Sequence, residues 1–281
     1  MKVLKKPQEV TEQVMEWKRE GKVIGLVPTM GYLHEGHISL IKKAVEECDK
    51  VVVSDFVNPI QFGPGEDLAS YPRDLEKDCK ACEEAGADLV LAPEPEDMYE
   101  DDFCTYVDMD GLTKGLCGKT RPTHFRGVCT VVSKLFHIAQ PDRAYFGQKD
   151  AQQLAVIRRM VRDLSFPITI VGCPIVREED GLAKSSRNTY LSPEERQAAL
   201  CLSRGLQAGK AIYLEGERTT APVIQAIQEV VEKEPLARID YIEAVDAVNM
   251  EPVSEIKKDV LVAMAVYVGT TRLIDNMLLV P

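Results

Sequence analysis

Two histidines three residues apart are the first candidates for chemistry in this sequence. His34 and His37 lie between an apolar run and an amphipathic segment from Ile38 to Cys48. This pattern predicts a strand, a loop and a helix. If the helix begins by Glu35, both imidazoles lie on one side of its first turn, beside backbone N–H groups that suit a phosphate. The spacing therefore indicates two hydrogen-bond donors next to an anion site.

Two other roles are open for this histidine pair. Each imidazole could cap the helix or satisfy a loop carbonyl, or the two could bind zinc. The spacing disfavours zinc, because the zinc-binding histidines of metalloprotease helices are one residue further apart. Gly31 and Gly36 allow the loop to turn sharply and to approach a ligand closely, which favours the anion site. Pro28 has no N–H, so we expect the strand to end before it.

A second candidate phosphate site follows a short predicted strand from Arg143 to Phe146. The turn Gly147 to Lys149 leads from this strand into a predicted helix. A glycine turn, a lysine and a helix start together suit phosphate groups; Asp150 is able to cap the helix, and Gln153 lies one turn deeper. The alternative is a lysine that is simply solvated.

Two polar loops add further candidates. The loop that begins at Asp55 carries the carboxamides of Asn58 and Gln61, which suit a substrate with hydroxyl and carboxylate groups. Local turn chemistry explains Asn58 equally well. A later loop carries two cations and two hydroxyls at residues 184–187, and it ends at a capping box from Ser192 to Glu195.

Three basic or potentially basic side chains precede another predicted helix, from Val128 to Ala139. They are Arg121, His124 and Arg126. An anion site and a structural hydrogen-bond site explain this group equally well. No complete P-loop or Gly-x-Gly-x-x-Gly follows any predicted strand, so a nucleotide would be held by another device.

Strands and helices alternate along most of the chain, which implies parallel pairing with right-handed crossovers. The predicted strands are Val23–Val27, Val51–Ser54, Asp88–Ala92, Arg143–Phe146 and Pro167–Gly172, and the helices between and before them include Thr11–Glu20 and Asp74–Gly86. We expect an α/β fold, a Rossmann-like doubly wound parallel sheet in residues 1–175 with a second, smaller α/β C-terminal domain in residues 176–281. The second domain is predicted to contain two helices, to about Gly209 and at Thr220–Glu232, and strands at Ile239–Val245, Val260–Val268 and Thr271–Met277.

Composition limits the function classes. The chain has 281 residues, is 45% hydrophobic and carries a formal net charge of −11, which disfavours broad binding to nucleic acid or anionic membranes. No apolar stretch approaches a membrane span and the N-terminus lacks the apolar core of a signal peptide, so we expect a cytoplasmic protein. Eight cysteines then indicate packing rather than disulfides. The pair Cys79 and Cys82 lies in a charged helical pattern and is expected on a helix surface.

Taken together, three motifs resemble the pantoate–β-alanine ligase family. They are Pro28-Thr29-Met30-Gly31-Tyr32-Leu33-His34-Glu35-Gly36-His37, Phe146-Gly147-Gln148-Lys149-Asp150-Ala151-Gln152-Gln153 and Lys184-Ser185-Ser186-Arg187-Asn188. The likeness covers nearly the whole chain in order, and it includes Asn58-Pro59-x-Gln61-Phe62, Tyr71-Pro72-Arg73 and His124-Phe125-x-Gly127-Val128. The first motif is the family's version of the His-x-Gly-His signature of the nucleotidyltransferase superfamily. One departure is Lys184, where the family usually has methionine.

The resemblance implies an ATP- and Mg²⁺-dependent ligase of pantothenate and coenzyme A biosynthesis, which forms an amide bond through a pantoyl adenylate. It assigns catalysis to His34, His37, Lys149 and Arg187, with His37 as the proton donor. The ATP-binding residues that it implies are Pro28, Thr29, Met30, Gly31, Tyr32, Leu33, His34, Glu35, Gly36, His37, Gly147, Gln148, Lys149, Asp150, Val176, Lys184, Ser185, Ser186 and Arg187. Pantoate and β-alanine would be bound by Asn58, Gln61 and Gln153. The family also suggests a homodimer. From the predicted elements of the C-terminal domain, we expect it to bring the Lys184 loop over the sheet as a lid.

Three rival functions share some of these features. A cytidylyltransferase-like enzyme would have both signature loops but would need a phosphorylated acceptor and no second amine. An aminoacyl-tRNA synthetase would need a basic face for tRNA, which the net charge disfavours. A nucleotide sensor without catalytic activity would bind ATP and form no pyrophosphate.

Overall fold

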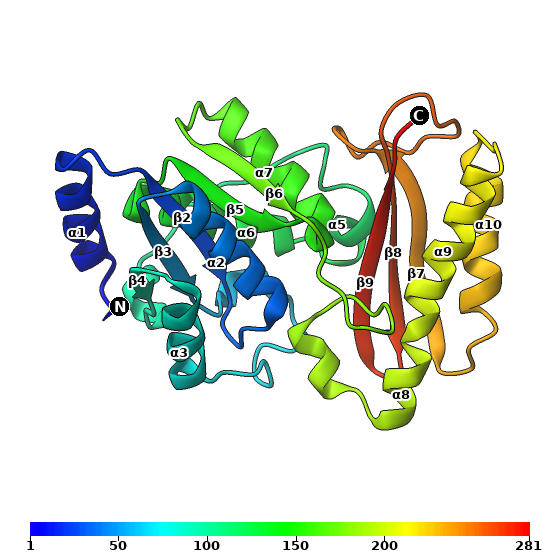
Figure 1. Cartoon of the computed structure of the whole chain (residues 1–281), viewed down its shortest axis with the longest axis horizontal. Coiled ribbons are helices and arrows are strands. Elements are labelled where there is room, and N and C mark those ends of the chain that lie inside the picture. Colours follow the sequence, from blue (N-terminus) through cyan, green and yellow to red (C-terminus); the bar gives the residue numbers. More distant parts are fainter. The chain divides into compact units, whose positions relative to one another are not determined.

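The computed structural model describes residues 1–281 (Figure 1), and the chain divides into two compact units. The first unit comprises residues 1–109, 121–148 and 156–174. The second comprises residues 110–120, 149–155 and 175–281. The longest continuous part of the second unit therefore starts immediately after Pro174, and two short earlier segments join it.

The first unit is built on a six-stranded parallel sheet with the strand order β1-β4-β3-β2-β5-β6. The strands are β1 (Lys2–Leu4), β2 (Ile24–Thr29), β3 (Lys50–Asp55), β4 (Leu89–Leu91), β5 (Arg143–Gly147) and β6 (Thr169–Cys173). From β2 the chain adds β3 and β4 on one side, and it then returns to add β5 and β6 on the other. The order reverses between β2 and β5, which is where ligands bind in open α/β sheets. The predicted fold class is confirmed.

Helices connect these strands and cover the sheet (Figure 1). They are α1 (Pro7–Arg19), α2 (Glu35–Glu47), α3 (Leu75–Ala85), α4 (Pro95–Met98), α6 (His124–Ala139) and α7 (Ala151–Asp163), with 3-10 turns η1 (Pro59–Gln61) and η2 (Gln148–Asp150). One core cluster joins Ile41 of α2 to Val27, Val53 and Val90 of three adjacent strands. Burying these branched side chains between helix and sheet is the main stabilising contribution to such a layer.

The expectation that β2 ends before Pro28 is wrong. The strand continues to Thr29, and Pro28 pairs in register with Ser54 of β3. Ile24 exchanges backbone and side-chain hydrogen bonds with Asp142, so the even-numbered residues of β2 direct their polar backbone groups toward β5. The ladder between β2 and β5 ends at Leu26. The missing N–H of Pro28 therefore costs no ladder bond.

Helix α6 starts four residues earlier than the expected Val128, at His124. His124 and Phe125 are buried, and α6 packs against η1. A Cβ atom on Gly127 would lie 2.5 Å from Gln61 Cα and 2.5 Å from the carbonyl oxygen of Ile60. Close helix packing therefore requires glycine here, and this contact overrides its weak helix propensity.

The second unit contains an antiparallel sheet of three strands in the order β7-β8-β9, covered by two helices. The strands are β7 (Ala237–Asp246), β8 (Val260–Val268) and β9 (Thr271–Leu279); the helices and turns are α5 (Leu116–Thr120), η3 (Ser186–Tyr190), α8 (Pro193–Ala198), α9 (Leu200–Leu214) and α10 (Thr220–Val231). Val223 and Ile227 of α10 pack with Val262 and Met264 of β8. The predicted capping box is confirmed, because Ser192 accepts a hydrogen bond from Glu195 N–H and Glu195 accepts one from Ser192 N–H.

All eight cysteines are free thiols. Cys82, Cys129, Cys173 and Cys201 are buried, and Cys104 is exposed. The expectation that Cys82 lies on a helix surface is therefore wrong. Burial raises the pKa of the Cys82 and Cys129 thiols to about 12. No helix has both the length and the apolar character that crossing a membrane requires.

Gly127→Ala should destabilise the protein by about 1–3 kcal/mol, because the new methyl group would push α6 away from the backbone of η1. Chemical denaturation followed by circular dichroism would measure the change. Gly115→Ala is the matched control, since nothing lies within 4 Å of a Cβ atom there. An equal effect of the two substitutions would contradict the packing explanation.

Candidate functional site

The two imidazoles lie together at the start of α2. Their ring centroids are 4.1 Å apart, with an angle of 32° between the planes. His34 is the N-cap residue, and its Nδ1 accepts a hydrogen bond from Gly36 N–H at 3.1 Å. His37 Nδ1 accepts from His34 N–H at 3.4 Å. The predicted placement of both rings on one side of the first helical turn is confirmed.

Capping and anion binding use different atoms of these rings. In both imidazoles Nδ1 accepts a backbone N–H, so the proton of a neutral ring is on Nε2. Each ring is therefore fixed as an Nε2–H donor. The first turn of α2 adds the partial positive charge of a helix N-terminus. This arrangement suits an anionic ligand with several oxygen acceptors.

The backbone before His34 has an unusual conformation that is held in place by neighbouring groups. Gly31 and Tyr32 have φ values of 76° and 51°. Thr29 Oγ1 accepts from Gly31 N–H and donates to the carbonyl of Ser54. Asp78 of α3 accepts from Tyr32 N–H at 2.5 Å and from Leu33 N–H at 2.7 Å. The turn therefore depends on side chains from β2 and α3.

Sequence reasoning missed Asp78 and its neighbour Asp55. Asp78 is only 1% exposed. Asp55, at the end of β3, has one carboxylate oxygen buried without a hydrogen-bond partner. Burial and the adjacent Asp78 raise the pKa of Asp55 to about 7. A single acidic residue on a helix rich in charges gives no signal in the sequence, so the pair becomes visible only in three dimensions.

Asn58 and Gln61, the predicted substrate-binding carboxamides, contact each other. Asn58 Nδ2 donates to Gln61 Oε1 at 3.0 Å and to the carbonyl of Gly127 at 3.2 Å. Tyr99 Oη donates to Asn58 Oδ1 at 2.7 Å. Gln61 Nε2 lies 3.0 Å from Met30 Sδ, beside the histidine-bearing loop. Asn58 thus fixes the orientation of the Gln61 amide, and both side chains are buried.

The basic side chains around the start of α6 have protein partners. Arg121 forms a bidentate pair with Glu66, and His124 Nδ1 lies 3.0 Å from the carbonyl oxygen of Gln61. The guanidinium of Arg126 stacks on Tyr106 with 3.8 Å between Cζ and the ring centroid. These contacts favour a structural hydrogen-bond site over an anion site for this group.

In the second unit, Lys149 is tied to β9. Lys149 Nζ lies 3.8 Å from Asp150, and the Lys149 carbonyl accepts from Asn276 at 2.9 Å. Gln153 is half-buried. The next residue toward the N-terminus, Gln152, is buried and spans Leu112, Gly115 and Cys117 by hydrogen bonds. Gln152 is therefore a structural residue.

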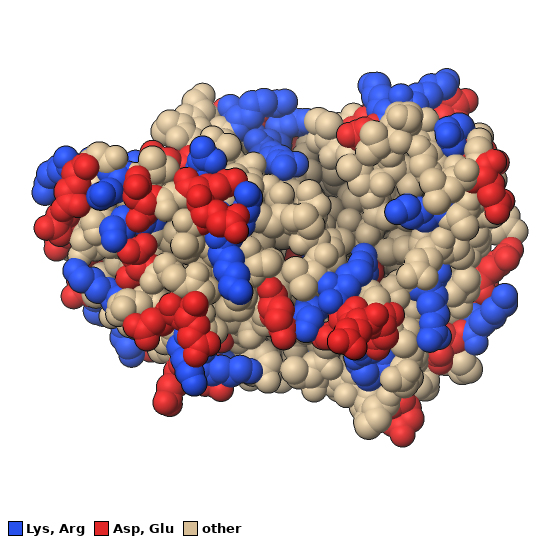
Figure 2. Space-filling model, viewed as in Figure 1, with Lys and Arg blue, Asp and Glu red and all other residues tan.

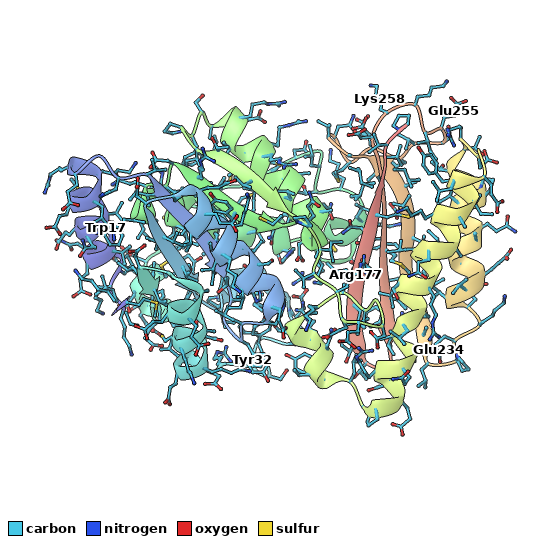
Figure 3. All side chains as sticks on the ribbon, in the orientation of Figure 1. Trp17, Tyr32, Arg177, Glu234, Glu255 and Lys258 are labelled. Carbon is cyan, nitrogen blue, oxygen red and sulfur yellow. The ribbon has the colours of Figure 1, made fainter.

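The loop at residues 184–187 is fixed by contacts at both of its ends. Ser185 caps η3 by accepting from Arg187 N–H, and Ser186 is buried. Lys184 Nζ lies 3.0 Å from Glu178, and Lys184 N–H donates to the carbonyl of Val176. Arg177 forms a bidentate pair with the buried Asp275 of β9, and Figure 3 shows Arg177 beside that strand. A buried carboxylate paired in this way anchors the hairpin that leads into the loop.

The fold and the histidine-bearing loop together indicate a class of protein. A parallel α/β sheet carries, at the carboxyl end of its central strand, a glycine-containing loop with paired imidazole donors at a helix N-terminus. Such a site belongs to nucleotide-binding proteins of the Rossmann-like type.

Comparison with known proteins then gives the family. The family model for pantoate-beta-alanine ligase matches residues 2–278. The pantothenate synthetase of Ruminiclostridium cellulolyticum is 60% identical over 281 residues, 100% of each chain, and that of Clostridium novyi is 62% identical over 273 residues, 97% of this chain and 96% of its own. The crystal structure of pantothenate synthetase from Thermus thermophilus has a TM-score of 0.94 and 47% identity, with 99% of both chains covered. The pantoate-beta-alanine ligase of Francisella tularensis, complexed with beta-gamma ATP and beta-alanine, has a TM-score of 0.81 and 32% identity, covering 99% of this chain and 97% of its own.

The chain therefore belongs to the pantoate–β-alanine ligase family, and the resemblance found from its motifs is confirmed. It is a member of a family of ligases that form an amide bond.

Tyr99→Phe should lower the free energy of unfolding by about 1–3 kcal/mol, because it leaves the buried Asn58 Oδ1 without its donor. Chemical denaturation would measure the loss. Tyr106→Phe is the control, since Tyr106 is 41% exposed and should change stability by no more than about 0.5 kcal/mol. An unchanged free energy of unfolding in Tyr99→Phe would show that the Asn58 orientation does not depend on this hydrogen bond.

Proposed function

We propose that this protein condenses pantoate with β-alanine, using ATP, to give pantothenate, AMP and pyrophosphate. Membership of the family over residues 2–278 supports the overall reaction. The observation that carries the chemistry is the pair of imidazoles, both fixed as Nε2–H donors at the start of α2. Donors in this position suit the oxygens of a polyphosphate.

In the first half-reaction, the pantoate carboxylate attacks the α-phosphorus of ATP, and the bond to pyrophosphate breaks. Charge develops on the phosphate oxygens, so catalysis consists mostly of positioning and electrostatic stabilisation. His34 and His37 donate to these oxygens, with His37 as the proton donor. Lys149, Ser185, Ser186 and Arg187 bind the triphosphate as cations and hydroxyl donors.

In the second half-reaction, the amine of β-alanine attacks the acyl carbon of the mixed anhydride, and AMP leaves. The anhydride activates a carboxylate that is otherwise inert to an amine. Gln61 and Gln153 bind the hydroxyl and carboxylate groups of pantoate. Asn58 contributes by orienting Gln61, since its own amide is already bonded within the protein.

The remaining contacts to ATP come from the backbone of Pro28 to Gly36, from Gly147, Gln148 and Asp150, and from Val176 against adenine. Lys184 contributes through its backbone, because its ammonium group already pairs with Glu178. Its N–H bonds the carbonyl of Val176, which supports a role in shaping the adenine site. We further propose that residues 1–175 bind nucleotide and pantoate, and that residues 176–281 close over them as a lid that excludes water.

Magnesium fits this scheme as part of the substrate. No group of three or more His, Cys, Asp or Glu side chains in the protein could hold a metal ion on its own. Mg²⁺ is commonly bound by substrate phosphates with water molecules and few protein ligands, so we propose MgATP as the substrate. We also propose a cytoplasmic homodimer that binds neither nucleic acid nor membranes. Acidic and basic side chains are interspersed on the face shown in Figure 2, which supports the last point.

The rival functions predict different products. Incubation with ATP, pantoate and β-alanine should yield pantothenate and AMP, identified by mass. A cytidylyltransferase-like enzyme or a synthetase acting on tRNA would form no β-alanine-dependent AMP, and a sensor would form no pyrophosphate. Any of these outcomes would reject the proposed reaction.

His37→Ala should lower pantoate-dependent exchange between ATP and pyrophosphate by about a hundredfold or more, because one donor to the transition state is lost. The fold should survive, as judged by circular dichroism. His137→Ala is the control, since His137 is an exposed residue near the end of α6. Exchange at the wild-type rate in His37→Ala would remove His37 from catalysis.

A further inference from the structure

Two carboxyl groups meet beneath the turn that carries His34. Asp55 comes from the end of β3 and Asp78 from α3, and their carboxyl groups lie close enough for each to change the pKa of the other. A Cβ atom on Gly31 would lie 2.3 Å from Asp55 Oδ1 and 3.3 Å from Asp78 Oδ2. The turn therefore rests directly on the carboxyl pair, with no space for a side chain between them.

A hydrogen bond between these groups requires a proton, because two carboxylates have only acceptors. Asp78 already accepts two backbone N–H groups, from Tyr32 and Leu33, which favours its ionised form. Asp55 has no such donors, and one of its oxygens is buried without a partner. The proton therefore belongs on Asp55, which donates it to Asp78.

The surroundings do not neutralise a second negative charge. Burial is the largest influence on the pKa of both carboxyls and raises it in each case. The other acidic neighbour is Asp74, at the N-cap of α3, and the nearby thiols are Cys79 and Cys82 of the same helix. Lys77 lies over the ring of Tyr32, 5.2 Å from its centroid, and is not among the main influences on either carboxyl.

We propose that Asp55 and Asp78 are positioning residues that share one proton, with Asp78 as the ionised acceptor that holds the turn and Asp55 as the protonated donor that holds Asp78. The link to the reaction rests on the proposed function, because the turn places His34. The carboxyl pair itself does not touch the reacting atoms in this scheme. Its role is to keep the amides of Tyr32 and Leu33 in one place.

This arrangement makes the roles of the two aspartates unequal. Asp55→Asn replaces a protonated carboxyl with an amide that also donates, so it should preserve the turn without any shared proton. Asp78→Asn has one acceptor in place of two and sets an amide N–H against a backbone N–H, so it should loosen the turn. Asp74→Asn is the control, because asparagine caps a helix as well as aspartate does.

The direct test is the pH titration of the Tyr32 and Leu33 amide resonances, measured by nuclear magnetic resonance on isotope-labelled full-length protein. In the wild type these amides should shift with a midpoint near pH 7, where Asp55 loses its proton because burial has raised its pKa to about 7. This titration step in the amide shifts should be absent in Asp55→Asn and present in Asp74→Asn. A step that persists in Asp55→Asn would belong to a histidine and would overturn the proposal, as would the absence of any step in the wild type.

A second test uses thermal stability. The raised pKa of Asp55 means that the folded protein holds a proton that the unfolded chain releases near the ordinary value of 3.8, so wild-type stability falls as pH rises from there to about 7. The melting temperature of Asp55→Asn relative to wild type should therefore increase across this range. A constant difference would contradict the shared proton.

Activity gives the last comparison. At pH 7, Asp78→Asn should lower kcat/KM for ATP by about tenfold or more, whereas Asp55→Asn should stay within about threefold of wild type. Equal losses in both variants, with normal folding, would overturn the unequal roles. If the amide titration appears as expected but neither the wild type nor any variant forms pantothenate, the proposed function is wrong and the shared proton of the carboxyl pair is still supported.

Discussion

The backbone amides of a short turn are the constraint on which the candidate site depends. Between Thr29 and Glu35 the chain leaves a central strand, passes through two residues with positive φ and enters a helix. Every amide that this turn buries needs an acceptor, and the protein supplies Thr29 Oγ1, the Asp78 carboxylate and the two Nδ1 atoms. In both imidazoles Nδ1 accepts a backbone N–H, so each ring supports the turn through that nitrogen.

The same logic governs the neighbouring carboxamides. Gln61 has a defined orientation because Asn58 donates to it, and Asn58 is oriented by Tyr99 and by the carbonyl of Gly127. Gly127 also brings α6 against η1, where Gln61 is located. Gly127, which has no side chain, thus helps to position Gln61, whose side chain we assign to substrate binding. In both parts of the first unit, preorganisation comes from buried hydrogen bonds and close packing.

Much of this could be predicted from the sequence. The apolar run Val51–Ser54 and the periodicity of Val10, Val14 and Trp17 predict a strand and a helix that the structure contains as β3 and α1, since hydrophobic burial determines both. The edge strand β1 is not predicted. The spacing of His34 and His37 placed the two rings together for the same geometric reason. The family followed from motifs that extend over nearly the whole chain.

The remainder depends on contacts between residues far apart in the chain. Pro28 remains in a strand because the neighbouring ladder ends early, and His124 begins a helix because it is buried against η1. Asp78 gives no signal in a helix with several other charges, and its role appears only when Tyr32 and Leu33 are seen to bond it. Each of these features is set by a partner that local propensity cannot identify.

The free cysteines have a consequence for chemical durability. A thiol with a pKa near 12, as at Cys82 and Cys129, is almost entirely protonated at neutral pH. Peroxides attack the thiolate, so these side chains fill the core without becoming weak points for sulfenic acid formation. Among the eight thiols, Cys104 is the exposed one, and it lies in a segment without helix or strand, so it is the thiol that an oxidant meets first.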